Sequence, residues 1–241
     1  MFNAKVLAAC AAALLALAPA AHAQTVDPAA TAGVWLPPTS LGHLVLIQRN
    51  VSGTWTTIGT GMMDTASKVV TTAHLVSGVA VSLLRVVTPV LTTDPAYAIG
   101  TVSAAVVNPS YSSTTGVNDC AVLRLASSLV FNPTVIGAST VPAVGATVQA
   151  VGHVTYVAGP HPVQDVVNTN TSTNPITTST AIWATPASGF PQEKGQFLAP
   201  LGTISPSASL TVYGLFSYSN GVAQPQVFTR LSGFKTWIDA Q

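Results

Sequence analysis

The sequence predicts an all-β protein, built as a sandwich or as a pair of barrels, and three observations carry this prediction. Short runs rich in Val, Ile, Leu, Thr and aromatic residues follow one another from residue 43 to residue 231. Turn residues separate these runs, for example at 50–53, 108–111 and 159–162. No sustained helical period occurs before residues 234–238, where FKTWI can form one or two amphipathic turns. Many short strands at this spacing are typical of sandwiches and barrels.

The predicted strands fall into two groups with a break between them. In chain order the runs are HLVLIQ (43–48), TWTTIGTG (54–61), KVVTTAH (68–74), GVAVSLLRVV (78–87), YAIGTVSAAVV (97–107), CAVLRL (120–125), TVQAVGHVTYV (147–157), SLTVYGLFSYS (209–219) and QVFTRL (226–231). Between 127 and 142 the strand pattern is interrupted by Pro133, Gly137 and Pro142. Because proline and glycine break strands, a boundary between two halves is predicted there.

The first 23 residues have the pattern of a Sec-type secretory signal. Lys5 supplies the positive start, residues 6–18 the apolar middle, and Ala21 to Ala23 an A-x-A cleavage site. Leu7 to Cys10 imitate a bacterial lipoprotein box, but only six residues precede them, so lipidation is disfavoured. We therefore expect a secreted or periplasmic protein that begins at Gln24, with a poorly ordered leader over 24–41.

Composition and charge exclude several classes of function. Loss of Lys5 with the signal lowers the eight basic residues to seven, which equals the number of acidic residues. A chain with no excess of positive charge is not expected to bind nucleic acid. No segment after the signal is apolar for long enough to span a membrane, so no membrane span is expected. With 48% hydrophobic and only 6% charged residues, the chain is expected to fold rather than to be disordered.

The cysteines and histidines predict neither a disulfide nor a cofactor. Cys10 is lost with the signal, so Cys120 is the only mature thiol and cannot form an intrachain disulfide. Its apolar setting favours a buried, inert thiol over a reactive one. We expect no metal and no other cofactor, because neither the spacing nor the accompanying acids of a metal site are found around the histidines His43, His74, His153 and His161.

Two residues are candidates for acid–base chemistry. His74 follows the β-branched run at 68–72, which can hold a side chain rigidly beside a cleft, although a single histidine beside apolar residues is more often structural. Asp119 lies 45 residues later, at the mouth of the apolar strand CAVLRL. A buried carboxylate would orient the imidazole and stabilise its charged form. Asp119 is equally well explained as a turn residue that accepts backbone N–H groups.

Five segments in order resemble the chymotrypsin/trypsin family of serine proteases, the S1 family, over residues 42–239. They are VVTTAHLV, similar to the catalytic-histidine segment, NDCAVLRLASSLVFNPTV, similar to the aspartate segment, TVQAVGHVTY, YGLFSYSNG, and PQVFTRLSGFKTWI, which resembles the closing strand and C-terminal helix. The resemblance implies two packed six-stranded antiparallel β-barrels, at about 42–135 and 136–230, and a short C-terminal helix. It also implies that His74 and Asp119 are the triad histidine and aspartate, in a cleft between the barrels.

The family's nucleophile motif, GDSGGP, is replaced by QEKGQF at 192–197. On this resemblance Lys194 stands at the serine position, Gln192 at the oxyanion glycine, and Gly195 keeps its glycine. Lysine has no hydroxyl with which to form a serine ester. A side chain at position 192 also disfavours the glycine-type backbone that aims N–H groups at an oxyanion.

A specificity pocket is still implied by the resemblance. Ser188 falls at its base, and its wall is expected to be formed by Ser217, Tyr218 and Ser219. No IVGG-type activation sequence precedes the first strand, and GVWL at 33–36 is at most a remnant of one.

These residues leave three hypotheses about function. The favoured one is a secreted, trypsin-like protease homologue that is catalytically inactive and acts as a binding or scaffold protein, with a peptide or protein ligand in the cleft. The alternative is an active S1 endopeptidase that uses a displaced serine, for which Ser188 and Ser205 are the nearest candidates. A purely structural β protein is the third. Whether the chain is an enzyme therefore stays open at this point, with inactivity favoured.

Overall fold

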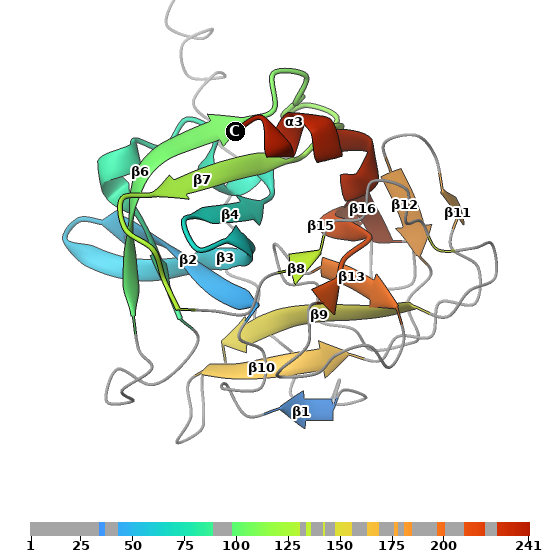
Figure 1. Ribbon diagram of the computed structural model, residues 1–241, viewed down its shortest axis with the longest axis horizontal. Helices are drawn as coiled ribbons and strands as arrows, with labels where there is room; N and C mark the ends of the chain where they lie inside the picture. The colour runs from blue at the N-terminus through green and yellow to red at the C-terminus, as the bar shows by residue number, and fades with distance from the viewer. Residues whose placement is uncertain are drawn as a thin grey trace, which may run out of the picture.

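The computed structural model shows two β-sheet halves and, at the end of the chain, a short C-terminal helix (Figure 1). It describes residues 34–36, 43–88, 98–130, 134–135, 142, 148–155, 163–168, 176–177, 181–184, 197–200, 210–219 and 226–241. The predicted signal at 1–23 lies outside the described residues. The trypsin-like fold expected from the sequence is confirmed by the closed barrel, the second sheet and the C-terminal helix.

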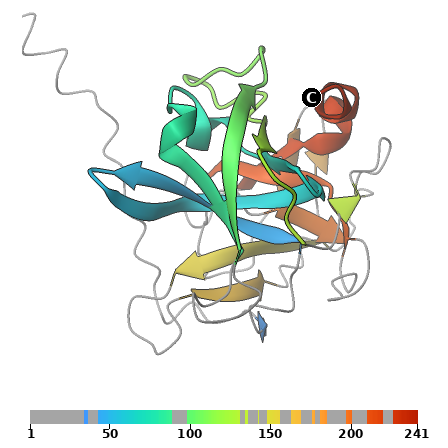
Figure 2. The same cartoon turned by 60° about the vertical axis from the view of Figure 1, so that its left-hand side comes forward.

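Six strands of the first half close into a barrel in the order β2-β3-β4-β7-β6-β5, called the first barrel below. The strands are β2 Leu44–Val51, β3 Thr54–Thr65, β4 Lys68–Thr71, β5 Leu84–Val87, β6 Ile99–Val107 and β7 Ala121–Leu125. Neighbouring strands in this barrel run antiparallel. Figure 2 shows the β2–β3 hairpin projecting from it.

The interior of the first barrel is filled by branched aliphatic side chains. Val69, Val86 and Leu123 have no exposed surface, and they belong to one apolar cluster with Ile47. The packing is tight enough to require glycine at position 61, because a Cβ there would lie 2.6 Å from Val69 Cγ1. The β-branched runs of the sequence therefore form the barrel wall that was predicted.

Most described strands of the second half lie in one eight-stranded sheet, called the second sheet below. Its order is β1-β10-β9-β13-β15-β16-β12-β11. The strands are β1 Val34–Leu36, β9 Val148–Thr155, β10 Val163–Asn168, β11 Ile176–Thr177, β12 Ala181–Ala184, β13 Phe197–Pro200, β15 Gly214–Ser219 and β16 Gln226–Arg230. Two short strands, β8 Thr134–Val135 and β14 Leu210–Thr211, pair with each other in parallel.

Three elements differ from those expected. Val34–Leu36 pairs with β10 as strand β1, inside the segment 24–41 for which a poorly ordered leader was expected, and the rest of that segment lies outside the described residues. The run at 78–87 is a strand only from Leu84, because Gly78 turns the chain at φ 73° and a 3-10 turn, η3 Val81–Leu83, follows. The run at 68–74 ends as a strand at Thr71, and the helical turn α2 Ala73–Val76 replaces its last residues.

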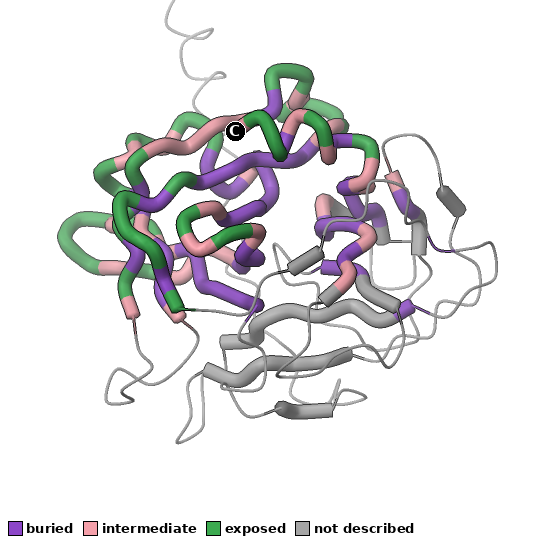
Figure 3. Tube along the Cα trace, in the orientation of Figure 1, coloured by how far each residue is buried: buried purple, intermediate pink, exposed green. Residues whose placement is uncertain are grey.

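The two halves meet in a shared apolar cluster. It combines first-barrel side chains with side chains of the second half, none more than 9% exposed: Leu44, Met62, Val70, Cys120, Val122, Phe197, Val212, Leu215, Leu231, Phe234 and Ile238. Figure 3 shows buried residues along the barrel strands and along the segment that leads into the C-terminal helix, α3 Lys235–Asp239. The burial predicted for Cys120 is confirmed, and the reason is its place inside this joint.

Candidate functional site

The candidate site begins with His74, which lies in the first turn of α2, directly after β4. Ala73, Leu75 and Val76 on either side of it are buried, so the turn is held against the barrel by apolar contacts. The side chain of His74 itself is 25% exposed. The sequence therefore folds into an anchored turn that leaves one polar ring at the surface of the barrel.

Asp119 lies two residues before β7 and directly follows a bend in the backbone at Asn118. Asn118 has φ 58°, a left-handed conformation that asparagine tolerates better than most residues. Its side-chain amide donates to Ser110 O (2.9 Å), and Cys120 N–H donates to Asn118 O (2.8 Å). These contacts hold the bend, which directs the Asp119 carboxylate into the barrel rim, where it is only 2% exposed.

His74 and Asp119 are in direct contact. The His74 backbone N–H donates to Asp119 Oδ1 (2.8 Å), and His74 Nδ1 lies 2.7 Å from Asp119 Oδ2. A carboxylate accepts hydrogen bonds, so this contact assigns the ring proton to Nδ1 and leaves Nε2 as the acceptor of a neutral imidazole. Both interpretations of Asp119 hold together, since it accepts a backbone N–H and also orients the ring.

Strand pairing explains why residues 45 positions apart meet. β4 and β7 are antiparallel neighbours, with Thr71 opposite Ala121. His74 follows one end of β4, and Asp119 precedes the adjoining end of β7. The register of these two strands therefore sets the distance between the imidazole and the carboxylate.

Ser217 is the third polar group at the site, and it comes from the second sheet. Its Oγ lies 2.7 Å from Asp119 Oδ2 and 3.1 Å from Gly116 O. A hydroxyl has one proton, so these two oxygens share it or take it in turn. The register between β15 and β16 shifts between Phe216 and Tyr218, so Ser217 is the extra residue of a β-bulge. Bulges commonly redirect a side chain, as this one does toward the first barrel.

Sequence reasoning placed Ser217 on a pocket wall and missed its contact with Asp119. One signal was available, because Ser217 is a polar residue between two aromatic residues, Phe216 and Tyr218. The bulge that turns this serine toward the first barrel leaves no mark in the sequence that can be distinguished from ordinary alternation.

Two neighbouring groups have raised pKa values. Burial, and then the nearby Asp119 charge, raises the pKa of the Tyr111 phenol. The same two causes in the same order raise the pKa of the Cys120 thiol. Both groups therefore stay protonated at neutral pH, which agrees with the interpretation of Cys120 as an inert thiol.

The remaining predicted site residues lie outside what the structure describes. They are Ser188, Gln192, Lys194 and Gly195, and their roles stay predictions. Tyr218 and Ser219 are described only as backbone of β15, so the predicted pocket wall also stays a prediction. Among the described residues, no group of three or more His, Cys, Asp or Glu side chains could hold a metal ion. Within the same residues, no helix is both long and apolar enough to cross a membrane.

Chemically, the described part of the site is an oriented base. The carboxylate fixes the ring and would stabilise its protonated form, so Nε2 is suited to take a proton from a neighbouring group. Ser217 is not that group, because its hydroxyl binds the carboxylate rather than the ring. In the described residues, the arrangement thus supplies a base but shows no hydroxyl placed for activation.

Comparisons with known proteins agree with this architecture. The scabies mite inactivated protease paralogue S-I1 is similar in structure, with a TM-score of 0.67 and 18% identity, over 86% of this chain and 97% of that one. The Vibrio cholerae VesB protease also has a TM-score of 0.67, with 15% identity over 86% of this chain and 65% of that one. None of the curated proteins matches the chain. The family model for trypsin matches residues 37–238, and the chain therefore belongs to the trypsin family of S1-type serine proteases.

Proposed function

We propose that this chain is an exported trypsin-family protein that has lost proteolytic activity and acts as a binding or scaffold protein. One feature of the sequence carries the proposal: by resemblance of segments, Lys194 takes the place of the family's serine nucleophile, whereas His74 and Asp119 match its histidine and aspartate. A base without a nucleophile cannot form the acyl-enzyme. In a related triad, loss of the serine alone lowers turnover by about 10⁶.

The retained pair has a structural reason to persist. Asp119 is 2% exposed, and its carboxylate accepts bonds from the His74 backbone, the His74 ring and Ser217. A buried carboxylate that lost these donors would be strongly destabilising. The pair is therefore useful to the folded protein even where it has no reaction to catalyse.

The fold itself accommodates both active and inactive proteins. One of the two similar structures is named as a protease and the other as an inactivated protease paralogue. The fold alone therefore does not distinguish an active from an inactive protein. The lysine at position 194 supports inactivity, because it has no hydroxyl. The ligand we propose is a peptide or protein, bound in a cleft that the resemblance implies between the halves, and the partial exposure of His74 is consistent with such a site.

A fluorophosphonate probe tests the loss of activity, because it labels a serine that is activated by a neighbouring histidine. We expect no labelling of the intact protein above that of the His74→Ala variant. Stoichiometric labelling of a serine that disappears in His74→Ala would overturn the proposal and would instead support a displaced nucleophile, such as Ser188 or Ser205.

Restoring the serine separates loss of the nucleophile from damage to the whole loop. Lys194→Ser alone is expected to remain inactive toward peptide esters, because Gln192 and Gln196 still replace the glycines of the oxyanion loop. The matched comparison is the triple variant with Gln192→Gly and Gln196→Gly. Ester cleavage by Lys194→Ser alone would refute the claim that the oxyanion loop is also altered.

A further inference from the structure

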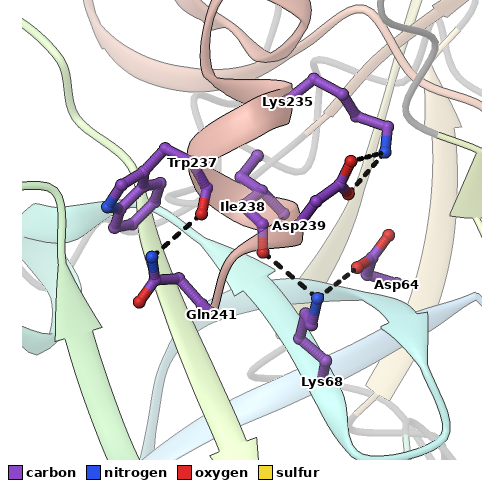
Figure 4. Close-up of polar contacts among 7 residues, drawn as sticks. All are labelled: Asp64, Lys68, Lys235, Trp237, Ile238, Asp239 and Gln241. Carbon is purple, nitrogen blue, oxygen red and sulfur yellow. Dashed lines mark hydrogen bonds and ion pairs between the residues drawn. The ribbon is translucent and has the colours of Figure 1, made fainter.

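The C-terminal segment crosses from the second sheet to the first barrel. β16 ends at Arg230, the 3-10 turn η4 covers Leu231–Phe234, and α3 follows at Lys235–Asp239. Leu231 N–H donates to Tyr213 O (3.0 Å), which fixes the start of the segment to the second half. Its other end lies against the first barrel (Figure 4).

Apolar side chains of this segment complete the joint between the halves. Leu231 and Ile238 have no exposed surface, and they share one cluster with Val70, Cys120 and Val122 of the first barrel. Cys120 therefore lies in the same buried cluster as side chains of the C-terminal segment. Burying two such aliphatic side chains contributes several kilocalories per mole by the usual area relation.

A polar clamp adds to this apolar contact. Lys68 Nζ donates to Ile238 O (3.2 Å) and lies 3.4 Å from Asp64 Oδ2, and the Lys68 and Asp64 side chains are only 15% and 13% exposed. The ammonium group thus donates a hydrogen bond to a carbonyl at the C-terminal end of α3, where the partial charge of a helix is negative. Figure 4 shows that Lys235 and Asp239 pair on α3 itself, without reaching the barrel.

The clamped strand is the one that leads to the candidate site. Lys68 begins β4, which ends at Thr71, just before α2 and His74. β4 pairs with β7, and Val70 lies opposite Val122 beneath the C-terminal segment. The segment therefore holds one end and one face of the strand pair whose other end carries His74 and Asp119.

We propose that residues 231–241 form a strap that closes the joint between the two halves, and that release of this strap gives access to Cys120. The proposal does not depend on whether proteolysis has been lost. It requires the joint to open by a local motion, at a lower free energy than global unfolding.

Alkylation of Cys120 measures this opening directly. In a Cys10→Ser background, Cys120 is the only thiol of the full chain. The strap variant is Lys68→Met with Asp64→Asn, which removes the ammonium group without leaving the carboxylate unpaired. Two controls match it: Asp64→Asn alone keeps the bond from Lys68 to Ile238 O, and Lys235→Met removes only the ion pair within α3.

We expect the strap variant to be alkylated about tenfold faster than either control, the factor that corresponds to losing one hydrogen bond from a charged donor. Ile238→Ala should accelerate alkylation further, because it leaves a cavity in the joint. Equal rates in the strap variant and the two controls would overturn the proposal. An alkylation rate of the Cys10→Ser parent that is no faster than its global unfolding constant allows, as measured by urea denaturation, would overturn it as well.

Discussion

In the first half of the chain, six strands close on themselves around their own side chains and present His74 and Asp119 at one rim. In the second half, eight of the described strands form one sheet that ends at β1 and β11, and the sequence at 192–197 reads QEKGQF, which differs from the family's nucleophile motif GDSGGP. In the half that carries His74 and Asp119, the buried Asp119 carboxylate accepts three hydrogen bonds, so we expect it to contribute to the stability of the fold.

Removal of the Asp119 carboxylate is the test of this contrast with the largest expected effect on the free energy of unfolding. Asp119→Ala leaves the His74 N–H, the His74 ring and Ser217 without their acceptor, and we expect it to lower the free energy of unfolding by about 3–5 kcal/mol. Ser217→Ala removes only the contribution from the second sheet and should cost about 1 kcal/mol. Urea denaturation of both variants measures the difference. A cost below about 1 kcal/mol for Asp119→Ala would show that the pair is not retained for stability.

The comparison also shows how far each half could be predicted from its residues. The barrel strands follow from β-branched runs such as Val69 and Val70, and the meeting of His74 with Asp119 follows from the order of similar segments. Those features depend on residue type, which the sequence records directly. The first half was therefore predictable both in its fold and in the contact between these two residues.

Backbone geometry accounts for what was missed. The Ser217 contact depends on a bulge in β15, and the loss of strand at 79–83 depends on a left-handed turn at Gly78. The bulge is decided by the pairing of β15 with β16, and the turn by the backbone conformation that one glycine adopts, and the composition of the two runs reveals neither. The pairing of Val34–Leu36 with β10 was missed for the same reason, because three apolar residues become a strand only when an open edge accepts them.

A matched pair of glycines tests whether the two halves tolerate crowding equally. A Cβ at Gly214 of the second sheet would lie 2.8 Å from Thr229 O, a backbone atom of the β16 ladder. A Cβ at Gly61 would meet a side chain, Val69 Cγ1, at 2.6 Å. Ladder atoms cannot move without breaking hydrogen bonds, so we expect Gly214→Ala to cost about 3 kcal/mol and Gly61→Ala about 1–2 kcal/mol.

Shortening the neighbour distinguishes the two cases. Val69→Ala should recover part of the loss caused by Gly61→Ala, because the added methyl group then occupies space that the valine left. No such rescue is available to Gly214→Ala, since its closest contact is backbone. Urea denaturation of the single and double variants measures both effects. A smaller cost for Gly214→Ala than for Gly61→Ala would contradict the assignment of the stiffer site to the second sheet.

Alkaline titration tests the joint between the halves. Burial and the Asp119 charge raise the pKa of the Cys120 thiol above its ordinary value of 9.0, so above pH 9 the folded state holds a proton that the unfolded state has lost. This contribution to stability is complete below pH 9 and is lost as the pH rises toward the folded-state pKa. The free energy of unfolding should therefore fall by about 1.4 kcal/mol per pH unit more than in Cys120→Ala. Parallel pH profiles for the two proteins would show that the thiol ionises freely in the folded state.

The smallest expected effect separates the strap's contact with the barrel from contacts within the strap. Lys235 and Asp239 form an ion pair at 2.5 Å, but their side chains are 27% and 50% exposed and lie four residues apart on one helix. Exposed pairs of this spacing stabilise proteins by about 0.3–0.5 kcal/mol, so Lys235→Met should shift the urea midpoint only slightly. The effect should shrink further in molar salt, which screens exposed charges. A large, salt-insensitive loss in Lys235→Met would mean that α3 depends on contacts within the helix rather than on Ile238 and Lys68.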